Sequence, residues 1–431
     1  MSSIKSVQAS LTKPTAMADT NAALKAAEAL VEALKKNPNP SPAEHLDLVR
    51  LSNKVTSLIE QPYDIVTKFI EASALSGALY ALLMTGAMAK VPDEGAITAN
   101  ELAVAVDVHV SAIQRVMRVA LVNGVFAETA PDTYAHNLLS QSFQLGALGG
   151  VVVICQEQVK GILHLPEYFK SHQPDDLLDL KKSPYACAKG KEGKTYYDVL
   201  DEDATVRPIW NTTLAMMAAN MPITGMFPFA SLKEQVEREP ERPLIVDIAG
   251  GRGQALLKIR DDLSGAFSGR MILQDLPSVI ESLAAEDIPD IEKMAYDAFA
   301  PQPVKSKPNF YEPGTRKLTV LFSQDAHVYF MRRFLHDFYD DVCIHFLRNT
   351  AQAMCHDSRL IICDMLVPGT VDVYGPKEVY WLDMNLMVLT GKEKTLEEFR
   401  QILDAAGLEL VDIYPSGIGA TVQLEARLKR G

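Results

Sequence analysis

The sequence contains few cysteines, and none of them stands in a disulfide or metal-binding pattern. Five cysteines occur among 431 residues, and no two of them form a CxxC pair. We therefore expect neither a disulfide framework nor a zinc site, and we predict a reducing compartment, the cytoplasm. No histidines and carboxylates cluster at ligand spacing either, so no metal cofactor is predicted.

The sequence also lacks an excess of positive charge and long apolar runs. Its formal net charge of −13 argues against nucleic acid or an anionic membrane as a partner, because both attract clustered positive charge. The longest apolar run, residues 145–155, is far shorter than the roughly 20 residues that span a bilayer. Residues 1–20 are polar, without the apolar core of a signal peptide, and we predict that they are disordered.

Helical patterns dominate residues 21–230, which we assign to a first domain. Residues 21–36 carry an apolar stripe that needs a cover, either the rest of the fold or a second subunit. Residues 97–137 predict a helix, a turn, a second helix and a hairpin, the outline of a winged helix. Winged helices usually read DNA, but residues 61–140 hold four Lys or Arg against eight Asp or Glu. A scaffold used for packing is therefore favoured.

A change in the sequence pattern marks the second domain, residues 231–431. From about Glu241, short apolar runs that resemble strands alternate with helical patterns. This alternation predicts an α/β fold with a largely parallel sheet covered on both faces. The polar, charged connector between Met226 and Pro243 places the domain boundary there.

A glycine-rich turn follows the first of these strands, in IVDIAGGRGQALLKI. Gly250, Gly251 and Gly253 permit a sharp turn and a close approach of a ligand to the backbone. Asp275 ends the next strand, 22 residues beyond Gly253, where an acid can bind the ribose hydroxyls of a nucleoside cofactor. Asp247 can hold a cationic amino group, which favours S-adenosylmethionine over a dinucleotide. The alternative is a tight turn with a helix cap and a surface acid.

Five segments together resemble a known family. They are VDIAGGRG (246–253), QDLPSVIE (274–281), FLHDFYDD (334–341), ICDMLVP (362–368) and GKEKTLEEFRQILDAAG (391–407). Their order and spacing are similar to those of the winged-helix class of small-molecule O-methyltransferases, the plant caffeate and flavonoid type with its fungal secondary-metabolite relatives. The resemblance implies a Rossmann-like methyltransferase sheet behind an N-terminal winged-helix dimerisation and substrate-lid domain. It also implies S-adenosylmethionine as cofactor, S-adenosylhomocysteine as product, no metal and a homodimer.

The resemblance implies a role for individual residues. His336 matches the family's general base, with three carboxylates near it: Asp337, Asp364 and Glu393. Residues at the cofactor positions are Asp247, Gly250, Gly251, Gly253, Asp275, Leu276, Asp297, Ala298, Phe299 and Arg332. The stretch that lines the acceptor pocket in the family contains Trp210, Asn211, Met217 and Met221.

Three departures from the family pattern stand out. Ala249 replaces the first glycine of the usual turn, a change small enough that we expect the turn to survive. Asp364 stands where many plant members have Glu, so its carboxylate reaches one methylene less far towards His336. Residues 305–324 lengthen a link near the general base, and form either a lid or an exposed insertion.

The reaction predicted is methylation of a hydroxyl, for example a phenol or an N-hydroxyl, or of a carboxyl of a specialised small molecule. A neutral imidazole can take the acceptor's proton, and a carboxylate on its other nitrogen holds the ring in place. One alternative keeps the fold and cofactor for non-methylating chemistry, such as decarboxylation or a pericyclic step. A second, a winged-helix DNA-binding regulator, is disfavoured by charge. For His336 itself, the alternative is a structural residue packed at the start of a helix.

Overall fold

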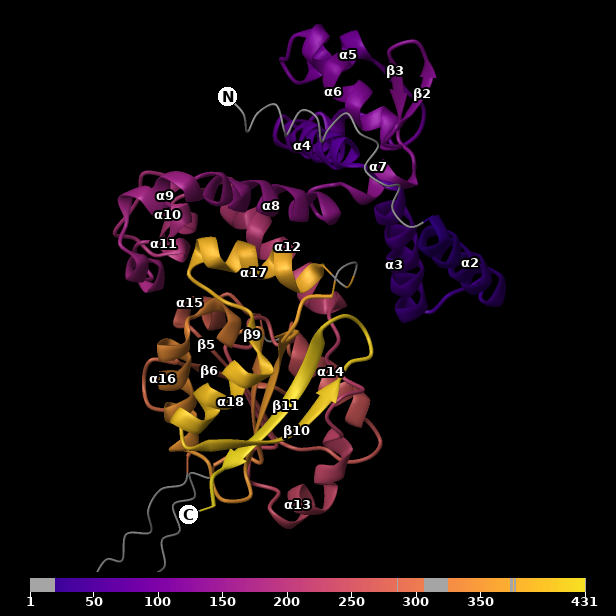
Figure 1. Ribbon diagram of the computed structural model, residues 1–431. Helices are drawn as coiled ribbons and strands as arrows, with labels where there is room; N and C mark the ends of the chain where they lie inside the picture. Colours follow the sequence, from indigo (N-terminus) through magenta and orange to yellow (C-terminus); the bar gives the residue numbers. More distant parts are fainter. Residues whose placement is uncertain (1–19, 285, 306–324, 373–374, 376, 431) are drawn as a thin grey trace, which may run out of the picture. The chain divides into compact units, whose positions relative to one another are not determined.

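The computed structural model describes residues 20–284, 286–305, 325–372, 375 and 377–430 (Figure 1). The predicted disorder of the N-terminus and the predicted lid or exposed insertion fall on residues 1–19 and 306–324, which lie outside the described residues.

Contacts divide the chain into two compact units. The first consists of the described residues within 1–163, 197–216 and 372–376, and the second of those within 164–196, 217–371 and 377–431. Residues 164–196 thus group with the later part of the chain. The sequence-based boundary near residue 230 remains a prediction.

Three helices open the first unit: α2 (Thr20–Lys36), α3 (Pro42–Ile59) and α4 (Pro62–Met84). Helix α2 packs against α3. Ser41 starts α3 with a capping box, in which its side chain accepts from the Glu44 N–H and the Glu44 carboxylate accepts from Ser41.

Helix α4 is long and apolar enough to cross a membrane, judged by length and composition alone. The search for an uninterrupted apolar run missed it because charged and hydroxyl residues are spaced along its sequence. Its second half contributes Leu79, Leu82 and Leu83 to a buried cluster, whereas Tyr63 and Phe69 near its start are exposed. Core helices of ordinary globular domains pass the same length test, so this feature is weak evidence for a membrane.

The predicted helix–turn–helix and hairpin are present. They comprise β1 (Ile97–Thr98), α5 (Ala99–Ala105), α6 (Val110–Val122), β2 (Ala127–Ala130) and β3 (Thr133–Ala135). The three strands form an antiparallel sheet in the order β1-β3-β2. Ile113 and Met117 of α6 are buried in the same cluster as the second half of α4.

Further short elements complete this part of the chain. They are η1 (Met88–Lys90), α7 (Leu138–Ser142), α8 (Leu148–Leu163), α11 (Tyr196–Asp201) and α12 (Val206–Asn220). Helix α8 packs against α4, and Tyr80 donates to Glu157 across this pair at 2.7 Å.

A twisted sheet forms the centre of the second unit, with strands in the order β10-β11-β8-β7-β4-β5-β6 and β9 beside β8 (Figure 1). Strands β4 to β9 are paired parallel with one another. Strands β10 and β11 form an antiparallel hairpin at one edge, where β11 is also antiparallel to β8. The strands are β4 (Ile245–Ile248), β5 (Met271–Asp275), β6 (Glu292–Ala295), β7 (Val328–Arg332), β8 (Arg359–Val367), β9 (Lys394–Thr395), β10 (Leu408–Pro415) and β11 (Thr421–Leu428).

Both faces of this sheet are covered, as the apolar runs predict. Val246 and Ile248 of β4 pack in one cluster with Phe346 and Phe399. Ile245, on the opposite face of β4, packs in a second cluster. The helices of this unit are α9 (Leu165–Ser171), η2 (Pro174–Leu178), α10 (Pro184–Ala188), η3 (Phe229–Leu232), α13 (Lys233–Arg238), α14 (Gln254–Leu263), α15 (Pro277–Glu281), η4 (Leu335–Asp337), α16 (Asp340–Ala351), α17 (Glu378–Leu389) and α18 (Leu396–Ala405).

Candidate active site

The sheet brings the predicted cofactor residues to one edge. Strands β7, β4, β5 and β6 are parallel neighbours, so their carboxyl ends lie at the same edge, where open α/β folds bind ligands. The glycine turn follows β4, Asp275 ends β5, Asp297 lies just beyond β6, and Arg332 ends β7.

The glycine turn survives the alanine at its start. Ala249 adopts a left-handed conformation with φ of +56°, which costs roughly 1–2 kcal/mol for a residue with a side chain. Gly251 also has a positive φ, +60°, and its N–H donates to Asp275 Oδ2 at 2.8 Å. A Cβ atom at Gly250 would overlap the carboxylate of Asp247, so only glycine fits over this acid.

Asp247 is a buried carboxylate without a hydrogen-bond donor. Its side chain is 0% exposed, and among the described residues neither carboxylate oxygen has a hydrogen-bond partner. Burial raises the pKa of Asp247 to about 7, against the opposing effect of the positive charge of Arg332. An acid left in this state suits a cationic ligand group, which would supply the missing donors. The residue therefore fits the amino group of S-adenosylmethionine.

Asp275 is oriented by the backbone around it. It accepts from the Gly251 N–H and from the Leu276 N–H, both at 2.8 Å. Burial raises the pKa of Asp275, while these two N–H groups act in the opposite direction. Beyond β6, Asp297 accepts from the Phe299 N–H at 3.0 Å. The half-exposed Phe299 ring presents an apolar surface at this edge.

His336 lies between two carboxylates. It belongs to the short helix η4, which follows β7, and its side chain is largely buried. Its Nδ1 is 3.2 Å from Glu393 Oε1, and its Nε2 is 3.3 Å from Asp337 Oδ1. Glu393 is buried, whereas Asp337 is partly exposed. A ring that donates from Nδ1 to Glu393 leaves Nε2 free to accept a proton.

The segment GKEK, residues 391–394, surrounds the backbone of η4. A Cβ atom at Gly391 would overlap the carbonyl oxygen of His336, so the close approach requires glycine. Lys392 N–H donates to that same carbonyl at 2.8 Å. The buried Lys394 ammonium donates to the carbonyls of Leu335 and Phe338, both at 2.9 Å. The motif thus holds the histidine by its backbone as well as by Glu393.

Arg333 is a site residue that the sequence analysis missed. Its Nη1 lies 3.0 Å from Asp364 Oδ1 and 3.0 Å from Glu393 Oε1. Its backbone is left-handed, with φ of +51°, which turns the chain between β7 and η4. In the sequence, the only signal was a second arginine beside the predicted one.

Asp364 lies close to His336 and pairs with Arg333. The ligand atoms of Asp364, His336 and Glu393 lie within 4.8 Å of one another, but the hydrogen bond described for Asp364 goes to Arg333. Burial raises the pKa of Asp364 and of Glu393, and the nearby positive charge of Arg333 counteracts both shifts. Asp364, which is shorter than the Glu of many plant members, is thus contacted by the guanidinium of Arg333.

The electrostatics keep His336 neutral. Burial and then the positive charge of Arg333 lower the pKa of His336 to about 4, while Asp337 and Asp364 act in the opposite direction. At neutral pH the ring is therefore an unprotonated base. Once it takes a proton, Glu393 and Asp337 stabilise the imidazolium.

Two clusters of possible metal ligands are present in the described part of the chain, although none was expected from sequence spacing. One is His336 with Asp364 and Glu393, and Arg333 already supplies a cation to its two acids. This cluster is therefore suited to proton transfer rather than to metal binding. The other cluster consists of His172, Cys187 and Glu192.

The predicted acceptor residues lie in both units. Trp210 is buried and Asn211 exposed, and both belong to the first unit. Met217 and Met221 are half-buried and belong to the second unit. A common pocket for these four residues remains a prediction.

Comparison with known proteins identifies the family. The family model for the O-methyltransferase domain matches residues 193–409. O-methyltransferase hmp5 from Hypomyces subiculosus is 40% identical over 339 residues, which covers 78% of this chain and 79% of the relative. The chain belongs to this O-methyltransferase family, which confirms the predicted family and enzyme class.

Solved structures confirm the fold class. LepI in complex with SAM superposes with a TM-score of 0.78 at 20% identity, covering 94% of this chain and all of LepI. OxaC in complex with SAH and oxaline gives 0.79 at 23% identity, covering 95% of this chain and all of OxaC. The ligands of these two proteins agree with the predicted cofactor. Another structure of the same fold is described as a pericyclic reaction enzyme.

Proposed function

We propose that this protein transfers a methyl group from S-adenosylmethionine to a hydroxyl of a specialised small molecule, with His336 as the general base. The observation that carries the proposal is the placement of a neutral histidine between Glu393 and Asp337, 3.2 and 3.3 Å from its two ring nitrogens. Phenols and N-hydroxyls are the acceptors of choice, because their protons are acidic enough for a weak base to remove.

The catalytic residues have separable roles. His336 Nε2 takes the proton of the acceptor hydroxyl as its oxygen attacks. Glu393 accepts from Nδ1, fixes the tautomer and stabilises the imidazolium. Asp337, on the Nε2 side, adds negative charge that favours the protonated ring. The positive charge of Arg333 favours the ionised forms of Glu393 and Asp364, against the effect of burial, and favours a neutral resting ring.

The cofactor residues would bind and orient S-adenosylmethionine. S-adenosylmethionine, when bound, supplies a methyl group on a positively charged sulfur. Asp247 would hold its amino group, the turn at Gly250, Gly251 and Gly253 would admit it close to the backbone, and Asp275 would accept from its ribose hydroxyls. Leu276, Ala298 and Phe299 would contact the nucleoside, with Asp297 as a polar partner. Arg332 would lie beside the cofactor.

The acceptor pocket, oligomer and location are parts of the same proposal. Trp210, Asn211, Met217 and Met221 are the candidate acceptor contacts, because methionine thioethers adapt to an aromatic acceptor. The protein acts as a cytoplasmic homodimer. The exposed apolar side chains on α2 and on the first half of α4 support a second subunit as their cover. Sedimentation that shows a stable monomer at micromolar concentration would refute the proposed homodimer.

The test is incubation with labelled S-adenosylmethionine and small-molecule extracts of the source organism. We expect one compound to gain the label, and His336→Ala to reduce kcat by about 10²–10⁴-fold while the affinity for S-adenosylmethionine is kept. Full turnover by the alanine variant would refute the base assignment.

The fold also permits a second function. A neighbour of the same fold is described as a pericyclic reaction enzyme, so non-methylating chemistry with the same cofactor is the competing proposal. S-adenosylhomocysteine formed in step with product supports methyl transfer. Product formed without it supports the competing chemistry.

A further inference from the structure

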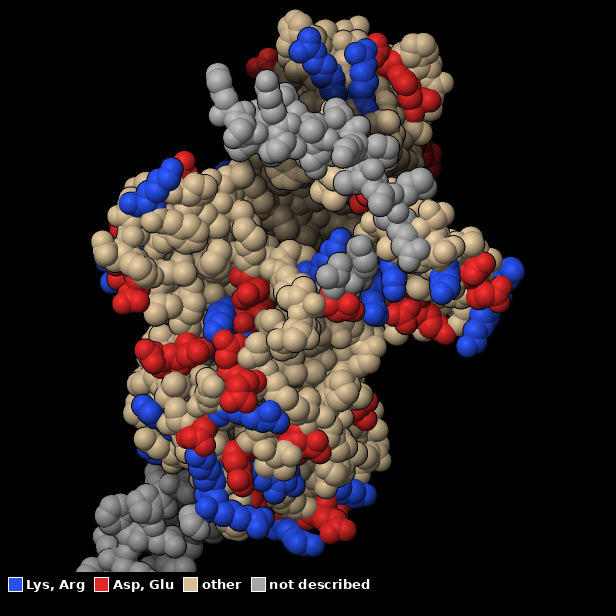
Figure 2. Space-filling model, in the orientation of Figure 1, with Lys and Arg blue, Asp and Glu red and all other residues tan. Residues whose placement is uncertain are grey.

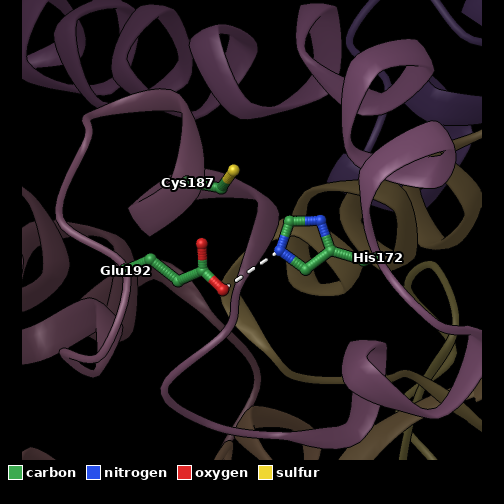
Figure 3. Close-up of side chains that lie close together, drawn as sticks. All are labelled: His172, Cys187 and Glu192. Carbon is green, nitrogen blue, oxygen red and sulfur yellow. Dashed lines mark hydrogen bonds and ion pairs between the residues drawn. The ribbon is translucent and has the colours of Figure 1, made fainter.

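A cluster of metal-ligating side chains lies in the second unit and shares no residue with the proposed catalytic site. His172, Cys187 and Glu192 each place a ligand atom within 4.8 Å of the other two. Figure 3 shows the three side chains around a common space, with the ring of His172 in contact with the carboxylate of Glu192. The proposed methyl transfer uses none of them.

The ring of His172 is fixed in position. His172 follows helix α9, and its ring stacks on Tyr168 with the ring centroids 4.0 Å apart. Its Nδ1 lies 3.2 Å from the carbonyl oxygen of Tyr168 and 2.9 Å from Ser171 Oγ. These contacts leave Nε2 directed at Glu192 Oε1, 3.1 Å away. A ligating histidine commonly has its second nitrogen bound to a backbone carbonyl in this way.

In one tautomer of the His172 ring, the contact with Glu192 suits a bridging cation. When Nδ1–H donates to Tyr168, Nε2 carries a lone pair that faces an oxygen of the carboxylate. Two acceptors at 3.1 Å repel each other unless a proton or a cation lies with them. A metal ion beside both atoms supplies that charge and is reachable from solvent, because Glu192 is 45% exposed.

Backbone geometry brings Cys187 and Glu192 together. Cys187 lies in α10, and the turn that follows contains Gly190 and Gly193, both with positive φ. Gly190 N–H donates to the carbonyl of Cys187 at 2.9 Å, which closes the turn that carries Glu192. His164 Nε2 lies 3.6 Å from Cys187 Sγ. An imidazole is thus already next to the sulfur.

We propose that His172, Cys187 and Glu192 bind a divalent cation of the zinc type, with His164 as the candidate fourth ligand. Imidazole nitrogen, thiolate sulfur and carboxylate oxygen are the ligands that Zn²⁺ accepts together. One thiolate and one carboxylate balance its two positive charges, so the complex is neutral.

The site stabilises a segment that packs against the catalytic region. Residues 164–196 consist of short helices and turns, which gain cohesion from a metal that joins α9, α10 and the turn after α10. Helix α10 packs against α17. Asp383 of α17 accepts from the backbone N–H of Glu393 at 2.8 Å. The metal therefore stabilises helix α17, whose Asp383 holds the backbone of Glu393, without touching the reacting groups.

Titration of the chelator-treated full-length protein with Co²⁺ tests this proposal. We expect one Co²⁺ per chain, the strong visible absorption of tetrahedral Co²⁺, and a thiolate charge-transfer band that Zn²⁺ abolishes by displacement. We also expect Zn²⁺ to raise the melting temperature by a few degrees.

Single substitutions assign the ligands. Cys187→Ser removes the charge-transfer band and weakens Zn²⁺ binding at least tenfold, while the control Cys155→Ser retains both. Glu192→Gln alters a half-exposed side chain, so the fold is kept while Zn²⁺ binding falls. Absence of a thiolate band in the unmodified protein, or equal Zn²⁺ affinity in Cys187→Ser, overturns the proposal and leaves a hydrogen-bonded His172–Glu192 pair only.

Discussion

Arg333 Nη1 lies 3.0 Å from Glu393 Oε1. His336 Nδ1 contacts this same oxygen at 3.2 Å, so one carboxylate oxygen serves both a permanent cation and a titratable ring. The arrangement favours a neutral ring, because a protonated ring and the guanidinium would repel each other across the shared oxygen. In the proposed reaction, Arg333 would therefore act through His336.

Replacement of Arg333 by methionine moves the acid limb of the pH profile. Since the charge of Arg333 helps to lower the pKa of His336 to about 4, its removal raises that pKa. A larger fraction of rings is then protonated at a given acidic pH, and the acid limb of kcat/KM moves to higher pH. The charge-conserving Arg333→Lys is the control and keeps the limb near its original position. An unmoved limb in Arg333→Met contradicts this role.

Arg333 and Asp364 are expected to be energetically coupled. Asp364 is buried at 1% exposure and Arg333 at 14%. Arg333→Met leaves buried carboxylates without their cation, and Asp364→Asn removes one of the two acids that pair with the guanidinium. Arg333→Met and Asp364→Asn should each lower the free energy of unfolding by about 3–5 kcal/mol. The double variant should lose less than the sum of these two effects, as measured by urea denaturation. Strict additivity would show that the two side chains act independently.

Glu393→Gln should reduce kcat by about 10²-fold, because the amide cannot stabilise the imidazolium as a carboxylate does. The affinity for S-adenosylmethionine should stay unchanged in equilibrium binding, since Glu393 contacts His336 and Arg333. Glu393→Asp keeps the negative charge, so its kcat should lie between those of the unmodified protein and the glutamine variant. Full kcat in the glutamine variant would show that Glu393 does not assist His336 as the base.

Gly391→Ala tests whether the close approach of the GKEK segment positions His336. The added methyl group overlaps the carbonyl oxygen of His336 and forces the two segments apart. We expect a loss of about 1–3 kcal/mol in stability and a lower kcat. Gly369→Ala is the matched control, because no heavy atom lies within 4 Å of its added methyl group. Equal kcat in the two variants would show that the contact is not needed for activity.

Local patterns predicted most of the fold, and long-range contacts account for what was missed. The strand after Pro243, the glycine turn and the helix that follows are continuous in sequence, so periodicity and glycine spacing were sufficient. Arg333 escaped because its partners Asp364 and Glu393 are 31 and 60 residues away, and because its left-handed backbone at φ of +51° aims it at them. No sequence rule assigns that conformation to an arginine.

The His172 cluster escaped for a related reason. Its ligands are separated by 15 and 5 residues, which matches no short metal-binding motif. They meet because α9, α10 and the turn after α10 fold against one another. The prediction of no metal cofactor relied on sequence spacing, and spacing does not describe tertiary proximity.

Asp247→Asn is expected to stabilise the cofactor-free protein and to weaken cofactor binding. Burial raises the pKa of Asp247 from 3.8 to about 7, so the folded state holds its proton more tightly than the unfolded state. This contribution to stability is fully present below pH 3.8 and is lost as the pH rises through about 7. Asparagine has no charge to bury, so the variant should be more stable by about 4 kcal/mol at pH 8 and similar near pH 4.

The same substitution removes the negative charge proposed to bind the amino group of S-adenosylmethionine. Calorimetric titration should therefore show at least a tenfold weaker affinity in Asp247→Asn, while urea denaturation of the cofactor-free protein shows the gain in stability. The two measurements separate a binding acid from a purely structural one, because a structural acid would change stability alone. Unchanged cofactor affinity in the asparagine variant would remove Asp247 from the binding site.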